Sequence, residues 1–429
     1  MSFLISLRRR TALAAMAAAV TGGAPAFAQF RVEVSGVGMT QLPIAIAMFR
    51  GEAQSPQKIS AIVKADLERS GMFRSIDSAG FTADEDSRPD LVSWKQKGVD
   101  ALVTGSVSPL ADGRYEVRLR LWDTVRGQDL GGQSYTVMRT DLRLSAHRVA
   151  DFVYEKLTGE RGIFSTRIAY VTKSGSRYTL WVADSDGESA QSALASPEPI
   201  ISPAWSPAGN QLAYVSFEAR KPVIYVHDVA TGKRRLVANF RGSNSAPAWS
   251  PDGSQIVATL SREGGSQLYA IPVAGGEPRR LTQSSSIDTE PAYAADGRAI
   301  YFVSDRGGAP QIYRMGPNGG NAERVTFTGS YNISPALSPD GRWLAYVSRV
   351  GASFKLHVLE LSSGAVSAIT DTAADESPSF APNSRLIVYA TQQQGAEALM
   401  TTTLDGKIKA KLSGIGGDIR EPDWGPFQR

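Results

Sequence analysis

The feature that most constrains this chain is a short motif that returns about every 44 residues. The first copy reads Ser-Pro-Ala-Trp-Ser-Pro-Ala-Gly at 202–209, and every copy contains a leading proline. The steps between successive leading prolines are 44, 44, 44, 43 and 44 residues, and the prolines are Pro203, Pro247, Pro291, Pro335, Pro378 and Pro422. A fixed period of about 40–45 residues with strand-like content is typical of a β-propeller with one blade per period.

Each period holds further strand signals in phase with the motif. An apolar run follows the second proline, as at 212–215 and 344–347. These runs are apolar on both faces, which suits a strand buried between two neighbouring sheets. A short basic strand ends the period, as at 233–236, and charge on an outermost strand discourages edge-to-edge pairing.

The ends of the repeat region predict how the ring closes. After Pro422 only seven residues remain, which is enough for one strand. The apolar runs at 168–171 and 180–182 fall in the phase of a period whose leading proline would stand at 159, where the inner strand is missing. We therefore expect six blades, with the sixth built from both ends of the propeller and closed by residues 420–426.

Residues 1–28 have the features of a signal peptide. Three arginines, Arg8, Arg9 and Arg10, precede a short apolar run, and Ala26-Phe27-Ala28 has the form of a signal-peptidase site. The run is too short to span a bilayer, so we expect cleavage after Ala28 and export of a soluble product. The paired arginines also leave a twin-arginine signal open.

Export changes the argument from charge. The formal net charge is +4, and the leader holds three arginines and no acidic residue, so the exported chain is near +1. The basic precursor therefore gives no reason to expect a nucleic-acid partner. The chain contains no cysteine, and a core of this size does not need disulfides.

The segment before the propeller does not follow the period. Residues 29–41 read as an extended arm, and residues 42–160 alternate strands and helices as a small mixed α/β domain. Helices are expected after Ser55, over 90–96 and over 141–157, with Gly159 as the stop. The predicted fold class is α+β, mainly β: a small α/β domain followed by a six-bladed β-propeller over 161–429.

Signatures of catalysis are missing from the sequence. There is no G-x-S-x-G nucleophile elbow and no phosphate-binding loop. His147, His227 and His357 are isolated, so no spacing suggests a metal site. The acidic stretch 184–188 looks faintly like a calcium loop but is read as a polar hairpin turn. We expect no catalytic residue, no cofactor and no metal.

The central opening of the ring is the candidate binding surface. Residues just before each leading proline lie where the chain crosses between blades, and this set is rich in acids and amides. Such a rim suits a protein partner, although the same residues could simply be solvated turns. The expected contact residues are Asn244, Ala246, Thr289, Glu290, Asn332, Asp375, Glu376 and Glu421.

The chain resembles the TolB family of the bacterial Tol–Pal envelope system. The resemblance rests on 100–105 (Asp-Ala-Leu-Val-Thr-Gly), 155–159 (Glu-Lys-Leu-Thr-Gly), the junction 166–171 (Thr-Arg-Ile-Ala-Tyr-Val) and the Pro-Ala-Trp-Ser-Pro-Asp-Gly blades. It implies a monomeric periplasmic scaffold that supports outer-membrane constriction at division, envelope integrity and protein import.

The same resemblance implies two protein partners. The propeller rim would bind Pal, the peptidoglycan-associated lipoprotein, and so hold the chain at the outer membrane. The segments 244–248 and 289–291 look similar to partner-contacting loops of the family. The arm would bind the C-terminal domain of TolA by strand addition. Its expected contact residues are Gln29, Phe30, Arg31, Val32, Glu33 and Val34.

Two alternatives belong to other classes. One is a periplasmic propeller enzyme, a lyase or lactonase, with a site in the central channel. Such sites place histidines, arginines or a metal on the inner strands, whereas these inner strands carry alanine, tryptophan and serine. The other is a propeller scaffold of a different envelope complex.

Overall fold

The structure is a computed structural model that describes residues 34–35, 41–393, 395–412 and 417–428. The predicted signal peptide at 1–28 and the arm residues 29–33 lie outside the described residues. No helix among the described residues is long and apolar enough to cross a membrane.

The α/β domain is built on one mixed sheet. Its strand order is β4-β2-β6-β7-β8; β2 runs parallel to β4 and β6, and β6, β7 and β8 are antiparallel neighbours. A small parallel pair, β3 with β5, adjoins it. The strands are β2 Leu42–Ile46, β3 Met48–Phe49, β4 Phe73–Ser75, β5 Thr82–Ala83, β6 Ala101–Pro109, β7 Tyr115–Asp123 and β8 Gln128–Val137.

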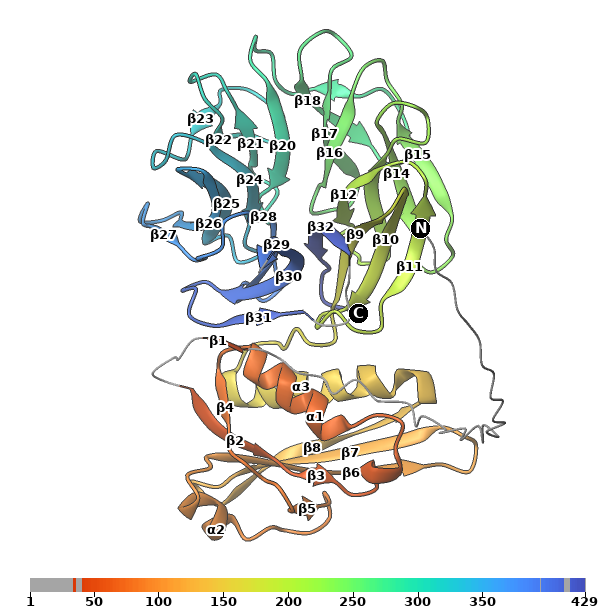
Figure 1. Cartoon of the computed structure of the whole chain (residues 1–429), viewed down its shortest axis with the longest axis vertical. Coiled ribbons are helices and arrows are strands. Elements are labelled where there is room, and N and C mark those ends of the chain that lie inside the picture. The colour runs from red at the N-terminus through yellow and green to blue at the C-terminus, as the bar shows by residue number, and fades with distance from the viewer. Residues whose placement is uncertain (1–33, 36–40, 394, 413–416, 429) are drawn as a thin grey trace, which may run out of the picture. The chain divides into compact units, whose positions relative to one another are not determined.

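Helices cover both faces of this sheet. The helices α1 (Ile59–Arg69) and α3 (Leu142–Thr158) lie side by side on one face, and α2 (Leu91–Gln96) lies on the other (Figure 1). The stop predicted at Gly159 is confirmed, because this residue ends α3 with φ 76°. Two 3-10 turns, η1 Glu52–Gln54 and η2 Arg139–Asp141, precede α1 and α3.

The predicted start of the first helix at Ser55 was wrong. The hydroxyl of Ser55 accepts only from the nearby Gln57 amide, and α1 begins at Ile59. The carboxylate of Glu52 takes the capping role, because it accepts from Ser60 N at 3.1 Å and Ser60 Oγ at 2.8 Å. A helix N-terminus has unpaired amides to satisfy, and here a residue outside the local capping pattern satisfies one of them.

The repeats form a six-bladed β-propeller within the described part of the chain, as the sequence predicts. The strands of each blade are named below in order from the innermost strand of the ring to the outermost (Figure 1). Blade 1 consists of β12 Ile200–Trp205, β13 Gln211–Ser216, β14 Val223–Asp228 and β15 Arg234–Ala238. Blade 2 consists of β16 Asn244–Trp249, β17 Gln255–Leu260, β18 Gln267–Pro272 and β19 Arg279–Arg280. Blade 3 consists of β20 Asp288–Tyr293, β21 Ile300–Ser304, β22 Gln311–Met315 and β23 Glu323–Arg324.

The remaining blades close the ring. Blade 4 consists of β24 Asn332–Leu337, β25 Trp343–Val350, β26 Ser353–Glu360 and β27 Val366–Ala368. Blade 5 consists of β28 Glu376–Phe380, β29 Leu386–Gln393, β30 Ala396–Thr403 and β31 Lys409–Lys411. Blade 6 consists of β32 Asp418–Trp424, β9 Arg167–Ser174, β10 Arg177–Asp184 and β11 Gln191–Ser196. In blade 6, β32 from the C-terminal tail pairs antiparallel with β9, so the chain's far end supplies the missing inner strand.

The apolar core of the propeller lies between blades. One cluster joins blades 1 and 2 through residues such as Ile224 and Ile256, and another joins blades 4 and 5 through Val347 and Ile387. This explains why the second strand of each repeat is apolar on both faces: each face packs against a different neighbour. The cluster that holds Trp424 of β32 also contains core residues of the α/β domain.

Candidate functional site

A left-handed residue precedes the leading proline in all six inner strands. The pairing register shifts at these positions, so each inner strand contains a bulge. The residues and their φ values are Ser202 (52°), Ala246 (49°), Glu290 (50°), Ser334 (54°), Ser377 (50°) and Glu421 (52°). A residue before proline normally adopts an extended conformation, and left-handed φ costs a non-glycine residue about 1–2 kcal/mol. Its repetition makes the bulge a feature of the blade.

These six residues line the central channel, whose volume is about 830 Å³. Part of the wall is apolar and is formed by the leading prolines with aromatic residues such as Trp205, Trp249 and Trp424. Four carboxylates also line it, and they are Glu290, Glu376, Glu421 and Asp423. The channel therefore combines an apolar wall with a strongly acidic lining.

Three of the channel carboxylates link neighbouring blades. Glu290 accepts from the Ser334 amide of the next blade at 2.7 Å, and Glu421 accepts from the Ser202 amide across the ring closure. Asp423 accepts from the Trp205 amide at 2.7 Å and from the Ser379 hydroxyl at 2.8 Å. These groups hold inner strands together where the bulges interrupt the ladder.

Burial controls the protonation of these acids. It raises the pKa of Glu376 to about 7, and the neighbouring Arg420 opposes the rise while other acids reinforce it. Burial also raises the pKa of Asp423 to about 6, against the hydrogen bonds that it accepts. The pKa values of Glu290 and Glu421 are raised for the same first reason.

The structure places the eight expected rim residues in three different settings. Ala246, Glu290, Glu376 and Glu421 line the channel. Thr289 is half-buried, and its hydroxyl accepts from the Thr259 hydroxyl at 3.2 Å. Of these five residues, four therefore line the open channel.

Three expected rim residues are instead buried supports of the loops that enter the inner strands. Asn244 accepts from the Phe240 amide at 2.9 Å and donates to carbonyl oxygens of the same loop. Asn332 donates to Gln311 Oε1 at 2.7 Å. Asp375 accepts from the Thr391 hydroxyl at 2.7 Å and from two other threonines. Because these side chains are 0–2% exposed, they are not positioned as contact residues.

The described part of the arm pairs with the propeller. Val34 and Ser35 form β1 (Val34–Ser35), which runs antiparallel to β31 opposite Ala410 and Lys409. The other expected arm contacts, Gln29 to Glu33, lie outside the described residues. The outer edge of blade 5 therefore accepts an added strand from this chain, the mode of pairing that the sequence predicts for a partner.

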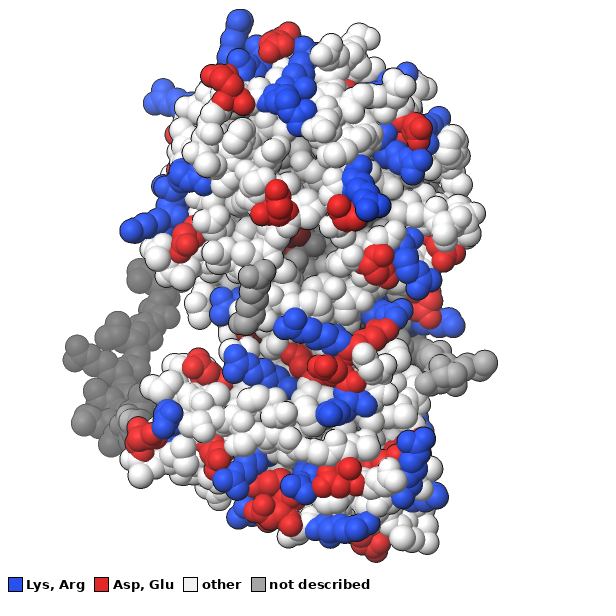
Figure 2. Space-filling model, turned by 180° about the vertical axis from the view of Figure 1, so that it is seen from behind, with Lys and Arg blue, Asp and Glu red and all other residues white. Residues whose placement is uncertain are grey.

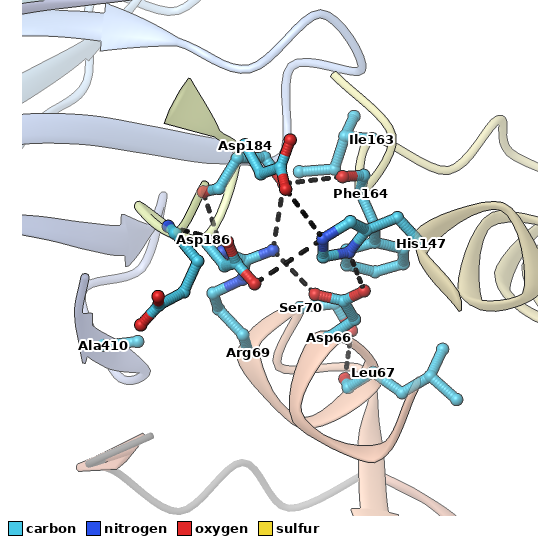
Figure 3. Close-up of polar contacts among 12 residues, drawn as sticks. Asp66, Leu67, Arg69, Ser70, His147, Ile163, Phe164, Asp184, Asp186 and Ala410 are labelled. Carbon is cyan, nitrogen blue, oxygen red and sulfur yellow. Dashed lines mark hydrogen bonds and ion pairs between the residues drawn. The ribbon is translucent and has the colours of Figure 1, made fainter. Parts of the chain in front are cut away.

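One group of functional interest was missed by the sequence analysis. His147 was interpreted as isolated, but it lies among Asp66, Asp184 and Asp186 (Figure 3). Arg69 and Arg143 pair with these carboxylates. The members come from two helices and a distant turn. No local spacing in the sequence could have indicated that they meet.

The surface gives no sign of a nucleic-acid site on the face shown in Figure 2. Positive and negative side chains are interspersed there, and neither sign gathers into one continuous patch. A protein that binds a phosphate backbone concentrates lysine and arginine on one face.

Comparisons with known proteins agree over the whole chain. Family models described as the TolB amino-terminal domain and the TolB beta propeller domain match residues 30–130 and 154–428. The Tol-Pal system protein TolB of Polaromonas naphthalenivorans (strain CJ2) is 85% identical over 429 residues, all of both chains. That of Dechloromonas aromatica (strain RCB) is 64% identical over 93% of this chain and 94% of its own. The crystal structure of TolB from Acinetobacter baumannii covers 92% of this chain and 99% of that chain, with 38% identity and a TM-score of 0.85.

Proposed function

The chain belongs to the TolB family of the Tol-Pal system, and on that premise we propose that it is a periplasmic protein-binding scaffold. It binds the lipoprotein Pal at the channel rim and the C-terminal domain of TolA through the arm at 29–34. In this role it supports outer-membrane invagination during division and envelope integrity. The observation that carries the proposal is the match to TolB over the full length, α/β domain and propeller together.

The channel chemistry favours binding over catalysis. Glu290, Glu421 and Asp423 use their carboxylate oxygens on backbone amides of neighbouring blades. Such groups hold the ring together and are poorly placed to exchange protons with a substrate. Of the rim carboxylates, Glu376 has the clearest freedom to meet a partner, because Glu290 and Glu421 are engaged by backbone amides of neighbouring blades.

The test measures both partners on the same protein. Replacing Glu376 by Lys puts a positive charge on the acidic rim and should weaken Pal binding by about tenfold or more, since charge mismatch at an interface costs several kcal/mol. Glu290→Lys should do the same, with its fold checked because it also loses the bond to Ser334. The matched control is Asp296→Lys, an equally drastic reversal in a turn at the end of blade 3's inner strand, with its side chain 58% exposed.

The arm is tested by deleting residues 29–36. The deletion should abolish binding of the TolA C-terminal domain and leave Pal binding and the propeller intact, because the arm contributes only two described residues to the propeller sheets. Calorimetric titration with each purified partner reports both affinities. Unchanged TolA affinity would contradict the arm assignment, and Pal affinity equal to that of Asp296→Lys in both rim variants would contradict the rim assignment.

A further inference from the structure

Six charged side chains from three separate elements meet between the helices and blade 6, and five of them are labelled in Figure 3. They come from α1, from α3 and from the end of β10 with the turn that follows. The members are Asp66, Arg69, Arg143, His147, Asp184 and Asp186. The side chains of Asp66, Arg69, His147 and Asp186 are 0–2% exposed, so the cluster is shielded from solvent.

The imidazole of His147 lies between carboxylates of the two sides. Its Nδ1 is 2.6 Å from Asp66 Oδ2, on the neighbouring helix. Its Nε2 faces Asp186 Oδ2 at 3.6 Å and Asp184 Oδ2 at 3.7 Å, both from blade 6. One ring therefore joins helix α1 and the blade through its two nitrogens.

The two arginines make the same connection. Arg69 binds Asp66 Oδ1 at 3.0 Å and donates to the Ser185 carbonyl oxygen at 2.7 Å, so it spans from α1 to the turn. Arg143 pairs with Asp186, and its Nε is 3.4 Å from Asp184 Oδ2. Every one of these contacts between the helices and the turn has charge on at least one side.

Among these six groups, the charges balance only when His147 carries a proton. Three carboxylates face two guanidinium groups, which stay charged in proteins, so a neutral imidazole would leave a buried negative charge without compensation. Burial lowers the pKa of His147, but Asp66 and Asp186 outweigh it and raise the pKa to about 10. Burial likewise opposes ionisation of Asp186, yet His147 and the arginines lower its pKa.

Two further acids lie near the cluster. Asp151 on α3 accepts from the amides of Phe164 and Ser165, and burial raises its pKa. Glu188 follows on the turn, and its amide donates to Asp186 Oδ1 at 3.0 Å.

A metal ion fits this cluster poorly. Asp66, His147 and Asp186 do offer ligand atoms within 4.8 Å of one another. Both carboxylates are already paired with guanidinium groups, however, and a divalent ion with a neutral imidazole would leave an excess positive charge beside two arginines. A proton on His147 neutralises the cluster without moving any group.

We propose that protonated His147 closes an ionic latch that fixes helices α1 and α3 to the turn after β10. Neutralising this residue loosens the contact locally while the sheets on either side stay intact. The proposal is independent of the binding function, because it concerns the contact of the helices with blade 6 and not the channel or the arm.

The test compares hydrogen exchange in three variants. His147→Gln should raise exchange at the amides of Gly187 and Glu188 by about tenfold or more, because breaking a buried ion network leaves a charge uncompensated. The second substitution Asp184→Asn removes that excess charge, so the double variant His147→Gln/Asp184→Asn should regain much of the protection. His357→Gln is the matched control, because it makes the same substitution at a buried histidine of β26 that stacks on Tyr346 and contacts the Lys355 carbonyl oxygen at 3.3 Å.

The pH dependence gives an independent readout on the unmodified protein. Since the folded pKa of His147 is raised, its contribution is complete below about pH 6.5 and is lost as the pH rises toward 10. Proton NMR of the wild type should therefore show a charged His147 imidazole through neutral pH. Hydrogen exchange at the Glu188 amide, corrected for the intrinsic rate, should increase as the pH rises from neutral toward 10.

Any of four results would overturn the latch. These are unchanged exchange in His147→Gln, no recovery in the double variant, titration of His147 near pH 6.5, or a stoichiometric metal ion that the substitution removes. The titration needs no variant, so poor folding of His147→Gln leaves the proposal open to refutation.

Discussion

One carboxylate of the channel, Glu376, has a pKa that the fold raises close to neutral pH. Glu376 is half-buried at the rim, where burial and then the nearby acids Glu421, Glu397 and Asp418 raise its pKa to about 7 while Arg420 opposes them. Burial of a carboxylate disfavours its charged form unless a partner compensates, and here compensation is incomplete.

Glu376→Gln should make the protein less sensitive to pH. Because the folded pKa is raised, ionising Glu376 costs stability, and this cost appears between about pH 4.5 and 7 and is complete above pH 7. The variant should therefore match wild type near pH 4 and exceed it in urea midpoint at pH 8. Glu277→Gln, whose side chain is 91% exposed, is the control. Equal pH profiles for wild type and Glu376→Gln would refute this assignment.

The same scale shows where reading the sequence fell short. Asn244, Asn332 and Asp375 occupy one repeat position, two residues before the left-handed residue, and all three are buried. The period that predicted a buried apolar run in each repeat also applied to these amides and acids. A polar side chain that recurs with the blade indicates a structural hydrogen bond as readily as a binding surface.

At the scale of elements, counting alone predicted six blades and the closure by the C-terminal strand, because each period needs four strands and the two ends supply complementary parts. The start of α1 was not predictable in this way. Its cap comes from Glu52, eight residues before its partner Ser60, through a bend that no local pattern encodes. The sequence did not predict the His147 cluster for the same reason, since its members come together only through tertiary structure.

Strand β32 gives the clearest test at this scale. Trp424 is buried, and its Nε1 donates to Thr166 Oγ1 at 2.8 Å. Trp424→Ala should cost about 3–5 kcal/mol in unfolding free energy, as expected for a buried tryptophan. Trp249→Ala removes the same repeat position from blade 2 and should cost a similar amount.

The two variants should differ in native-state proteolysis. Only Trp424→Ala loosens a strand that ends near the chain terminus, so only this variant should release C-terminal fragments rapidly before global unfolding. Equal cleavage patterns in the two variants would mean that β32 is held by more than the Trp424 side chain and the pairing of β32 with β9.

At the scale of the whole molecule, hydrogen bonds and an ion pair hold the segment that joins the two domains. The repeat period placed the domain boundary after residue 160, but it gave no sign that the joining segment is clamped. Asp151 of α3 accepts from the Phe164 amide at 2.7 Å and the Ser165 amide at 3.1 Å. Glu160 in the same segment pairs with Arg385 of blade 5.

Gly162 tests whether this clamp fixes the joint. A Cβ at this position would lie 2.5 Å from the Cα of Asp151, so Gly162→Ala must push the linker away from α3. We expect a loss of about 1–3 kcal/mol, the usual cost of overpacking, with faster hydrogen exchange at Phe164 and Ser165. Gly159→Ala is the control, because its φ of 76° imposes a backbone cost while nothing lies within 4 Å of the added carbon. It should destabilise the cap of α3 and leave the Phe164 and Ser165 amides protected. If those amides stay protected in Gly162→Ala as well, the linker can yield without releasing Asp151, and the domains are joined by their shared apolar cluster and not by the clamp.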